Sequence, residues 1–357
     1  MTIPRHGGNL VWAATLSGCP VSSILDFSAS INPLGPPPSV LTAIQSALTS
    51  LVHYPDPSYQ QLRSQLGEYH HLEGAWVLPG NGSAELLTLG GRLLAELDQT
   101  WLVTPAFGDY GRSLKAFGAK IQGIPWDVDQ PFPLSALGSR SVPPATGLIL
   151  NNPHNPTGYL LKRAEILPLL EHFRWVILDE AFMDFLPPAY QESLIADLPH
   201  YSNLIILRSL TKFYSVPGLR IGYALGHPHL LQELAAWRDP WPVNVLAEQA
   251  AITALQDHGF QQQTWDWLTT TQPQFYQALQ ALPGFTPYPS AVNFFLVKLA
   301  GSATALQRFL LQEHQILIRD CLSFPELGDR FFRIAVRTPI ENQRLLTGLA
   351  EWINGLC

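Results

Sequence analysis

Polar residues follow three consecutive apolar runs in the middle of the chain. Asn151 follows the run Gly-Leu-Ile-Leu, Asp179 follows Trp-Val-Ile-Leu, and Lys212 comes shortly after Leu-Ile-Ile-Leu. In an open α/β sheet the carboxyl ends of the strands border one crevice, and ligands bind there. An amide, a carboxylate and an amine would therefore meet at one place. An amine in such a site can bond covalently to a carbonyl group or transfer a proton.

The elements that must position these residues are short, continuous apolar strands alternating with helical patterns. The strands that we expect are 101–104, 147–150, 175–178, 204–207 and 221–225. Runs of this kind are typical of a mainly parallel sheet covered on both faces. We expect a large α/β domain at 46–244.

A different pattern follows in the last third of the chain. A strand at 292–297, a helix at 304–313, strands at 316–319 and 331–336, and a final helix to about Asn354 are expected there. This α+β pattern predicts a small domain at 245–357. We expect the segment 1–45 to join this small domain.

Capping boxes mark two helix starts in the sequence. Ser58 and Gln61 have the spacing of an N-cap residue and its N3 partner. Thr338 and Glu341 have the same spacing, with Pro339 at the first helical position. The proline-rich stretch 33–38 predicts a stiff connector before the large domain.

Composition and charge exclude several classes of protein. The 357 residues include 21 basic and 28 acidic side chains, a net charge of −7, and no run rich in Lys and Arg. A nucleic-acid or anionic-membrane partner is therefore not expected. No stretch approaches the roughly 20 apolar residues of a membrane span, so we expect a cytoplasmic protein. The three cysteines have neither metal-ligand nor disulfide spacing, so we expect reduced thiols and no metal site.

Five motifs together resemble the fold-type I pyridoxal 5'-phosphate (PLP) enzymes of the class I/II aminotransferase group. They are Gly-Asn-Gly-Ser-Ala-Glu at 80–85, Asn-Pro-Thr-Gly at 155–158, Asp-Glu-Ala at 179–181, Ser-Leu-Thr-Lys at 209–212 and Pro-Gly-Leu-Arg-Ile-Gly at 217–222. The resemblance covers nearly the whole chain. It implies the fold-type I transferase fold and PLP as the cofactor.

The resemblance also implies roles for residues of this chain around the cofactor. Lys212 would be the catalytic residue and carry PLP as a Schiff base, and Asp179 would keep the pyridine nitrogen protonated. Asn155 would donate to the ring oxygen, and Phe107 would stack on the ring. The cofactor's phosphate would be bound by the helix start at Gly82, Ser83 and Ala84, together with Ser209 and Arg220.

Two further features follow from the same resemblance. Tyr54 matches a tyrosine that reaches the cofactor phosphate of the other subunit, which implies a homodimer. Phe182 stands where relatives commonly carry a tyrosine that donates to the ring oxygen. The cofactor's electronic tuning, rather than its binding, would be affected by this change.

Two branches of the group share features with this chain, the L-threonine-O-3-phosphate decarboxylases and the histidinol-phosphate aminotransferases. The segments 5–9, 26–35, 179–182 and 332–338 are more similar to the decarboxylases, which supply the aminopropanol phosphate arm of cobalamin. The implied substrate is a phosphorylated amino acid or amine. A third interpretation, a non-catalytic PLP-binding regulatory module, is disfavoured because Lys212, Asp179 and Arg333 are all present.

The substrate-binding residues implied by the resemblance lie mainly near the two ends of the chain. Arg333 would bind the substrate's α-carboxylate in a bidentate fashion, which lysine could not do equally well. The substrate-binding set is His6, Ser30, Asn32, Asn155, Arg319, Arg333 and Arg337. Within it, Arg319 and His6 would meet the substrate's phosphate, with Ser30, Asn32 and Arg337 as helpers. Decarboxylation and transamination differ in which bond at the α-carbon breaks, and both remain open at this stage.

Overall fold

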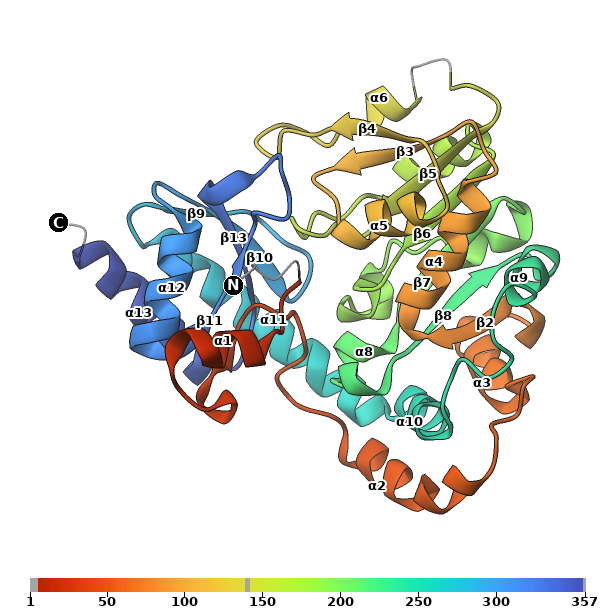
Figure 1. Ribbon diagram of the computed structural model, residues 1–357, viewed down its shortest axis with the longest axis horizontal. Helices are drawn as coiled ribbons and strands as arrows, with labels where there is room; N and C mark the ends of the chain where they lie inside the picture. Colours follow the sequence, from red (N-terminus) through yellow and green to blue (C-terminus); the bar gives the residue numbers. More distant parts are fainter. Residues whose placement is uncertain (1–5, 139–141, 356–357) are drawn as a thin grey trace.

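The computed structural model describes residues 6–138 and 142–355, so Arg5 and Cys357 lie outside the described residues. The helices are α1 (Leu10–Ser17), α2 (Pro38–Ala47), α3 (Gln60–His70), α4 (Gly82–Leu94), α5 (Gly108–Ala116), α6 (Leu134–Gly138), α7 (Arg163–Ile166), α8 (Leu210–Phe213), α9 (Pro228–Ala235), α10 (Val245–Gln256), α11 (His258–Gln280), α12 (Ala303–His314) and α13 (Pro339–Asn354). The strands are β1 (Leu25–Asp26), β2 (Val77–Asn81), β3 (Gln99–Thr104), β4 (Ile121–Pro125), β5 (Thr146–Asn151), β6 (Trp175–Asp179), β7 (Leu204–Ser209), β8 (Ile221–Gly226), β9 (Phe285–Pro287), β10 (Phe294–Leu299), β11 (Ile316–Leu317), β12 (Arg319–Asp320) and β13 (Phe331–Ala335). Figure 1 shows two main bodies side by side, each built around one sheet.

The larger sheet has seven strands in the order β2-β8-β7-β6-β5-β3-β4. Strand β8 runs antiparallel to both of its neighbours, and the other paired strands run parallel. The mixed, mainly parallel sheet expected from the apolar runs is therefore confirmed.

Both faces of this sheet are buried because side chains along each strand alternate between two apolar clusters. On β5, Leu148 and Leu150 belong to one cluster and Ile149 to the other. The second cluster includes the apolar faces of α4, α5 and α9. Such two-sided burial explains why the strands read as continuous apolar runs in the sequence.

Of the two capping boxes, the second is confirmed and the first is wrong. Thr338 and Glu341 cap α13 reciprocally, as their spacing predicts. At α3, however, the N-cap residue is Tyr59, whose own side chain makes no capping hydrogen bond. The reason is that the carboxylate of Asp56 accepts the backbone N–H groups of Ser58 and Gln60, each at 2.9 Å.

A four-stranded sheet in the order β12-β13-β10-β9 forms the second body, and α11, α12 and α13 lie beside it (Figure 1). The N-terminal segment reaches this part of the molecule, because β1 pairs in parallel with β11. Helix α10, in contrast, packs against α2 and α3. The pairing of β1 supports our proposal that residues 1–45 belong with the small domain at 245–357, and 46–244 with the large one.

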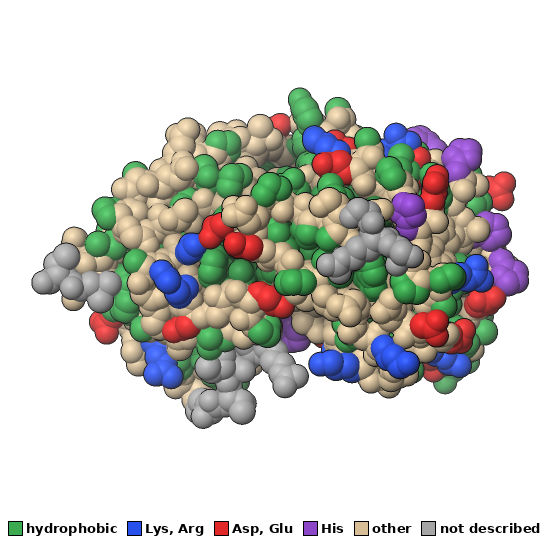
Figure 2. Space-filling model, turned by 90° about the horizontal axis from the view of Figure 1, so that it is seen from above, with side chains coloured by type: hydrophobic (Ala, Val, Ile, Leu, Met, Phe, Trp, Pro, Cys, Tyr) green, Lys and Arg blue, Asp and Glu red, His purple; other side chains and the backbone are tan. Residues whose placement is uncertain are grey.

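Charged side chains are dispersed on the face of the molecule shown in Figure 2, where Lys and Arg alternate with Asp and Glu. Among the residues that the structure describes, no helix combines the length and the apolar character needed to cross a membrane. Within the same residues, no group of three or more His, Cys, Asp or Glu could hold a metal ion.

Candidate active site

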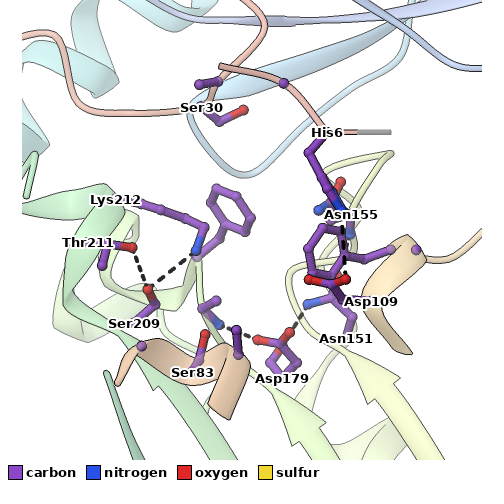
Figure 3. A pocket seen from close by; sticks show the side chains of 18 of the residues that line it. His6, Ser30, Ser83, Asp109, Asn151, Asn155, Asp179, Ser209, Thr211 and Lys212 are labelled. Atoms are coloured by element: carbon purple, nitrogen blue, oxygen red, sulfur yellow. Dashed lines mark hydrogen bonds and ion pairs between the residues drawn. The ribbon is translucent and has the colours of Figure 1, made fainter. Parts of the chain in front are cut away.

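A cavity of about 420 Å³ lies at the carboxyl ends of the parallel strands and is closed on the other side by residues of the small sheet. Its wall includes Asp179 from the end of β6, Lys212 from α8 and Arg333 from β13. Figure 3 shows Lys212 and Ser209 on one side of this space and Asn155 and His6 on the other, with Asp179 below. The crevice expected from the three strand ends is therefore present.

Strand register places Asn151 directly opposite Asp179. The Asn151 side chain donates to the backbone oxygen of Asp179 at 2.7 Å and accepts the backbone N–H of Asn155 at 2.6 Å. The loop that carries Asn155 is thus fixed to the end of β6. Asn151 was expected as the amide at this strand end, and its role in bracing the Asn155 loop depends on the register.

Lys212 lies in the short helix α8, which begins directly after β7. Its Nζ atom donates to the hydroxyl oxygen of Ser209 at 3.3 Å, and the Ser209 hydroxyl also shares a hydrogen bond of 2.8 Å with Thr211. Burial lowers the pKa of the Lys212 amine to about 8, an effect that Asp179 opposes. An amine with this pKa is partly neutral near pH 8, and the neutral form is the nucleophile.

An anion cradle is formed where β2 passes into α4. The backbone of Gly82 has φ = 71°, in the left-handed region, and a Cβ atom built there would lie 2.5 Å from Nη2 of Arg220. At Gly222 on β8, a Cβ atom would lie 2.5 Å from the backbone nitrogen of Ser83. Glycine at these positions therefore permits a close approach of the helix start and the Arg220 guanidinium. Ser209 lies opposite Gly222 in the β7–β8 pairing, so its hydroxyl borders the same cradle.

Aromatic side chains form two walls of the cavity. Phe107, at the start of α5, lines the cavity and contacts the ring of Tyr110 edge-on at 5.6 Å. On the other side, the Phe182 ring lies 5.2 Å from Nζ of Lys212 and packs edge-on against Phe294 at 5.0 Å. Phe182 therefore contributes an apolar surface at the position where the family resemblance implies a tyrosine hydroxyl.

Two arginines project into the cavity from neighbouring strands of the small sheet. Arg319 on β12 and Arg333 on β13 are directly paired in the antiparallel register. The guanidinium of Arg333 donates to the side-chain oxygen of Asn155 at 2.5 Å and to the backbone oxygen of Ser28 at 3.3 Å. Burial, followed by the neighbouring Arg319, lowers the pKa of Arg333 to about 10. Both arginines are cationic at neutral pH and suit an anionic ligand.

Small polar groups surround this pair of cations. The Ser30 hydroxyl lines the cavity, is buried, and has no hydrogen-bond partner among the described residues. Arg319 donates to the Ser323 hydroxyl at 2.6 Å, and Ser323 also lines the cavity. His6 lies at the rim, where its Nε2 atom is 3.7 Å from a carboxylate oxygen of Asp109. A ligand with several acceptor oxygens would find donors on more than one side.

Three residues of the expected site are not brought into this cavity. Asn32 donates its side-chain amide to the backbone oxygen of Phe213 and the hydroxyl of Thr264, each at 2.8 Å. Arg337 donates to Glu341 at 2.8 Å and to the backbone oxygen of Asp26 at 3.1 Å.

Tyr54 is the third of these residues. Its side chain is 80% exposed and stacks on Trp241, with the ring centroids 4.6 Å apart. It therefore points to the outside of this chain.

Tyr110 and Ser323 are among the cavity residues that sequence reasoning missed. Tyr110 comes three residues after Phe107 and donates its hydroxyl to the Asp179 carboxylate at 2.7 Å. The signal available in the sequence was the position of Tyr110 in the first turn of a helix that follows a strand end. Ser323 follows Arg319 by four residues in a loop, and no local pattern distinguishes it.

Comparisons with known proteins agree with this geometry. The family described as aminotransferase class I and II matches residues 22–349. A threonine-phosphate decarboxylase of Salmonella typhimurium is 38% identical over 98% of this chain and 97% of its own length.

Two solved structures extend the comparison. The histidinol-phosphate aminotransferase of Clostridium acetobutylicum has a TM-score of 0.86 at 28% identity, covering 93% of this chain and 100% of that one. The L-threonine-O-3-phosphate decarboxylase of Porphyromonas gingivalis has a TM-score of 0.80 at 27% identity, covering 92% and 99%.

Proposed function

The chain belongs to the class I and II aminotransferase family of PLP-dependent enzymes, and we propose that within it the protein decarboxylates L-threonine O-3-phosphate to aminopropanol O-phosphate. The observation that carries this proposal is the direct pairing of Arg319 and Arg333 at the cavity wall. Residues opposite each other on antiparallel strands have Cβ atoms about 5 Å apart. The two guanidinium groups therefore reach one cavity from neighbouring positions, which suits a small substrate with a carboxylate and a phosphate on adjacent carbons.

The residues of the cavity fit PLP. An anion cradle at the start of α4, a carboxylate at the end of β6 and an amine of lowered pKa on α8 border one space. When bound, PLP supplies an electron sink that accepts the electron pair of a bond at the substrate's α-carbon. We assign its phosphate to Gly82, Ser83, Ala84, Ser209 and Arg220.

The ring would lie between the aromatic walls. In the proposed arrangement, Phe107 stacks on the ring, Asn155 donates to its oxygen, and Asp179 holds the proton at its nitrogen. Lys212 holds the cofactor between turnovers and moves a proton at its Nζ atom during turnover.

In this proposal, residues of the small sheet orient the substrate. Arg333 would bind the α-carboxylate, and its hydrogen bonds to Asn155 and Ser28 fix the direction of its guanidinium. The bond that breaks is the one held perpendicular to the ring, so a rigid Arg333 decides whether the carboxylate or the α-hydrogen takes that direction. Arg319, Ser30, Ser323 and His6 would bind the substrate's phosphate.

Asn32 and Arg337 have a different place in this proposal. Each binds backbone groups rather than the cavity, since Asn32 contacts Phe213 and Arg337 contacts the backbone of Asp26. We propose that both hold the N-terminal segment in position beside the site, so that Ser28 and Ser30 face the substrate.

A homodimer is the proposed assembly. Exposed apolar side chains occur on α2 and in the residues after it: Leu41, Leu48, Leu51, Val52 and Tyr54. A second copy covering this surface would bury it and bring Tyr54 toward the other chain's cofactor phosphate. Light scattering should then give a mass of two chains, and Tyr54→Ala should weaken cofactor binding although it lies outside the chain's own cavity.

The second candidate function is that of a histidinol-phosphate aminotransferase. It is favoured by the higher TM-score of 0.86 to such an enzyme, against 0.80 to the decarboxylase. Histidinol phosphate carries a phosphate and an imidazole but no carboxylate, so it would use only one of the paired arginines. An amino acceptor such as 2-oxoglutarate, with two carboxylates, could use both.

Product analysis separates the two functions. The holoprotein is incubated with O-phosphothreonine or with histidinol phosphate, each with and without 2-oxoglutarate, while carbon dioxide and the cofactor spectrum are followed. We expect carbon dioxide and aminopropanol phosphate from O-phosphothreonine without any keto acid. Sustained turnover of histidinol phosphate that requires 2-oxoglutarate, with no carbon dioxide from O-phosphothreonine, would establish the second function instead.

A further inference from the structure

The two carboxylate oxygens of Asp179 have different and well-defined partners. Oδ1 accepts the backbone N–H of Ala181 at 2.9 Å, and Oδ2 accepts the hydroxyl of Tyr110 at 2.7 Å. The first bond comes from the chain just after β6, so it is local. The second joins residues 69 positions apart and exists only because α5 lies above the end of β6.

Tyr110 is held tightly where it donates this bond. The whole residue is only 2% exposed, and its ring belongs to the apolar cluster formed by α4, α5 and the sheet. The Phe107 ring packs edge-on against it with an interplanar angle of 83°. The hydroxyl therefore has a fixed direction and reaches Asp179 without any rearrangement.

The protonation states of the pair favour a donor on Tyr110 and an acceptor on Asp179. Burial, reinforced by the charge of Asp179, raises the pKa of the Tyr110 phenol well above its usual value, so the phenol keeps its proton. Burial also raises the pKa of the Asp179 carboxyl, and the Tyr110 hydrogen bond is the largest influence opposing that rise. Lys212 and the Ala181 backbone oppose it less.

We propose that Tyr110 is a positioning residue that keeps Asp179 ionised and aimed at the cofactor ring, so that the pyridine nitrogen stays protonated. This inference rests on the proposed function, because it requires Asp179 to meet the ring nitrogen. A carboxylate has about four lone-pair sites, so Oδ2 can accept from Tyr110 and still leave a site for a second donor. Loss of the Tyr110 hydroxyl would favour the neutral form of the Asp179 carboxyl, and a neutral carboxyl cannot stabilise a protonated ring nitrogen.

A merely structural role for Tyr110 makes a different prediction. The apolar contacts of the ring with Phe107 and the surrounding cluster would be kept by phenylalanine. If packing were the only role, Tyr110→Phe would therefore leave both the cofactor and the reaction unchanged. The hydroxyl is the part of the side chain that the proposal concerns.

The test measures the cofactor itself rather than only activity. Wild type and Tyr110→Phe are loaded with PLP carrying ¹⁵N in the ring, and the ¹⁵N chemical shift reports whether the ring nitrogen is protonated. In Tyr110→Phe we expect a shift toward the unprotonated value and cofactor binding about 10-fold weaker, the size expected for a lost hydrogen bond to a charged group. We also expect a lower kcat with a smaller change in KM, because the ring's electron-accepting capacity falls. Tyr59→Phe removes another buried tyrosine hydroxyl, which bonds to Val243, and should change none of these.

A second replacement keeps the proposal testable if Tyr110→Phe does not fold. Fluorotyrosine at position 110 retains the size of the side chain and makes the hydroxyl a stronger donor, so the ring nitrogen should stay protonated to higher pH. Wild-type ¹⁵N shift and cofactor affinity in Tyr110→Phe would overturn the proposal and leave the proposed function intact. If the cofactor is not attached to Lys212 in wild type, the proposed function itself fails.

Discussion

Arg333 on β13 donates a hydrogen bond of 2.5 Å to the side-chain oxygen of Asn155, which lies in the loop after β5. The two residues are 178 positions apart, and the bond connects the small sheet to the large one. In the proposed function Arg333 meets the substrate and Asn155 meets the cofactor. The bond therefore couples the direction of the substrate's carboxylate to the position of the cofactor ring.

The first prediction concerns the attachment of the cofactor. Purified protein should be yellow, and borohydride should fix the cofactor on Lys212, because this amine lies in the cavity with a lowered pKa. Peptide mass spectrometry checks the position. Lys212→Ala should keep the fold yet lose turnover by several orders of magnitude, since both covalent and proton-transfer steps need the amine. Reduced cofactor on any other lysine would contradict the assignment.

The second prediction is the pH dependence of Lys212 in the apoprotein. With a pKa of about 8, the amine gains reactivity as pH rises through 8 and reaches a plateau above it. Competitive labelling with an uncharged amine-reactive reagent measures this profile. Asp179 raises the pKa of Lys212, so Asp179→Asn should move the midpoint to lower pH. A midpoint near the ordinary lysine value of 10.5 would show that the amine is not buried as described.

A third prediction tests the apolar residue at position 182. Phe182 is buried beside Lys212 and offers no hydrogen bond to the cofactor's ring oxygen. Phe182→Tyr should add a hydrogen-bond donor to the ring oxygen. This donor would stabilise the deprotonated form of the link between Lys212 and the cofactor, and so lower the pKa at which the bound cofactor's visible band changes. Spectrophotometric titration of the holoprotein measures that pKa. If the value is unchanged or higher, another group already donates to the ring oxygen.

A fourth prediction separates the two phosphate sites. Arg319 lies on the small sheet beside Ser323, whereas the cradle is at the start of α4. Arg319→Ala should weaken substrate binding by about 2–5 kcal/mol if its charge pair with the phosphate is buried, with normal cofactor content. Ser323→Ala should have a smaller effect in the same direction.

The matched control for Arg319 is Arg220→Ala at the cradle. This variant should instead lower cofactor affinity. Loss of cofactor from Arg319→Ala with unchanged substrate affinity would mean that the two phosphate sites had been exchanged.

The fifth prediction concerns a buried ion cluster behind the site. Arg208 on β7 is 1% exposed and pairs with Glu180 at 3.0 Å and Asp184 at 2.6 Å. Arg208→Met would leave two buried carboxylates without their cation, at a cost of about 3–5 kcal/mol in the free energy of unfolding. Urea unfolding of the apoprotein measures this cost.

The pH dependence of this cost has a definite sign. Burial raises the pKa of both Glu180 and Asp184, and Arg208 opposes that rise. Without Arg208 the folded-state pKa of each carboxyl rises further above its unfolded value, so the variant should lose stability as pH increases through that range.

The control for Arg208→Met is Lys162→Met, which removes an exposed pair with Glu192 and should cost no more than about 1 kcal/mol in the free energy of unfolding. Equal costs for the two variants would contradict the burial argument.

Local sequence determined much of this protein's architecture. Continuous apolar runs were sufficient to predict five strands of the large sheet, since strands buried on both faces must be apolar throughout. The capping box at Thr338 was equally informative, because its two hydrogen bonds join residues three positions apart. The one at Ser58 failed because the carboxylate of Asp56, two residues earlier, accepts the backbone N–H groups of Ser58 and Gln60 instead.

The candidate site was decided partly by sequence and partly by tertiary structure. The positions of Lys212 and Asp179 were predictable because Asp179 ends β6 and Lys212 comes shortly after β7, and parallel strands end at one edge. The role of Tyr110 was not, because it depends on α5 lying above the end of β6. The role of Ser323 was not either, because no local pattern distinguishes the loop serine that accepts from Arg319. Asn32, in contrast, was expected to bind the substrate but does not reach the cavity, because its side chain bonds to Phe213 and Thr264 instead. Residue type and spacing determine what a side chain can bind, whereas the packing of distant elements determines which partner it meets.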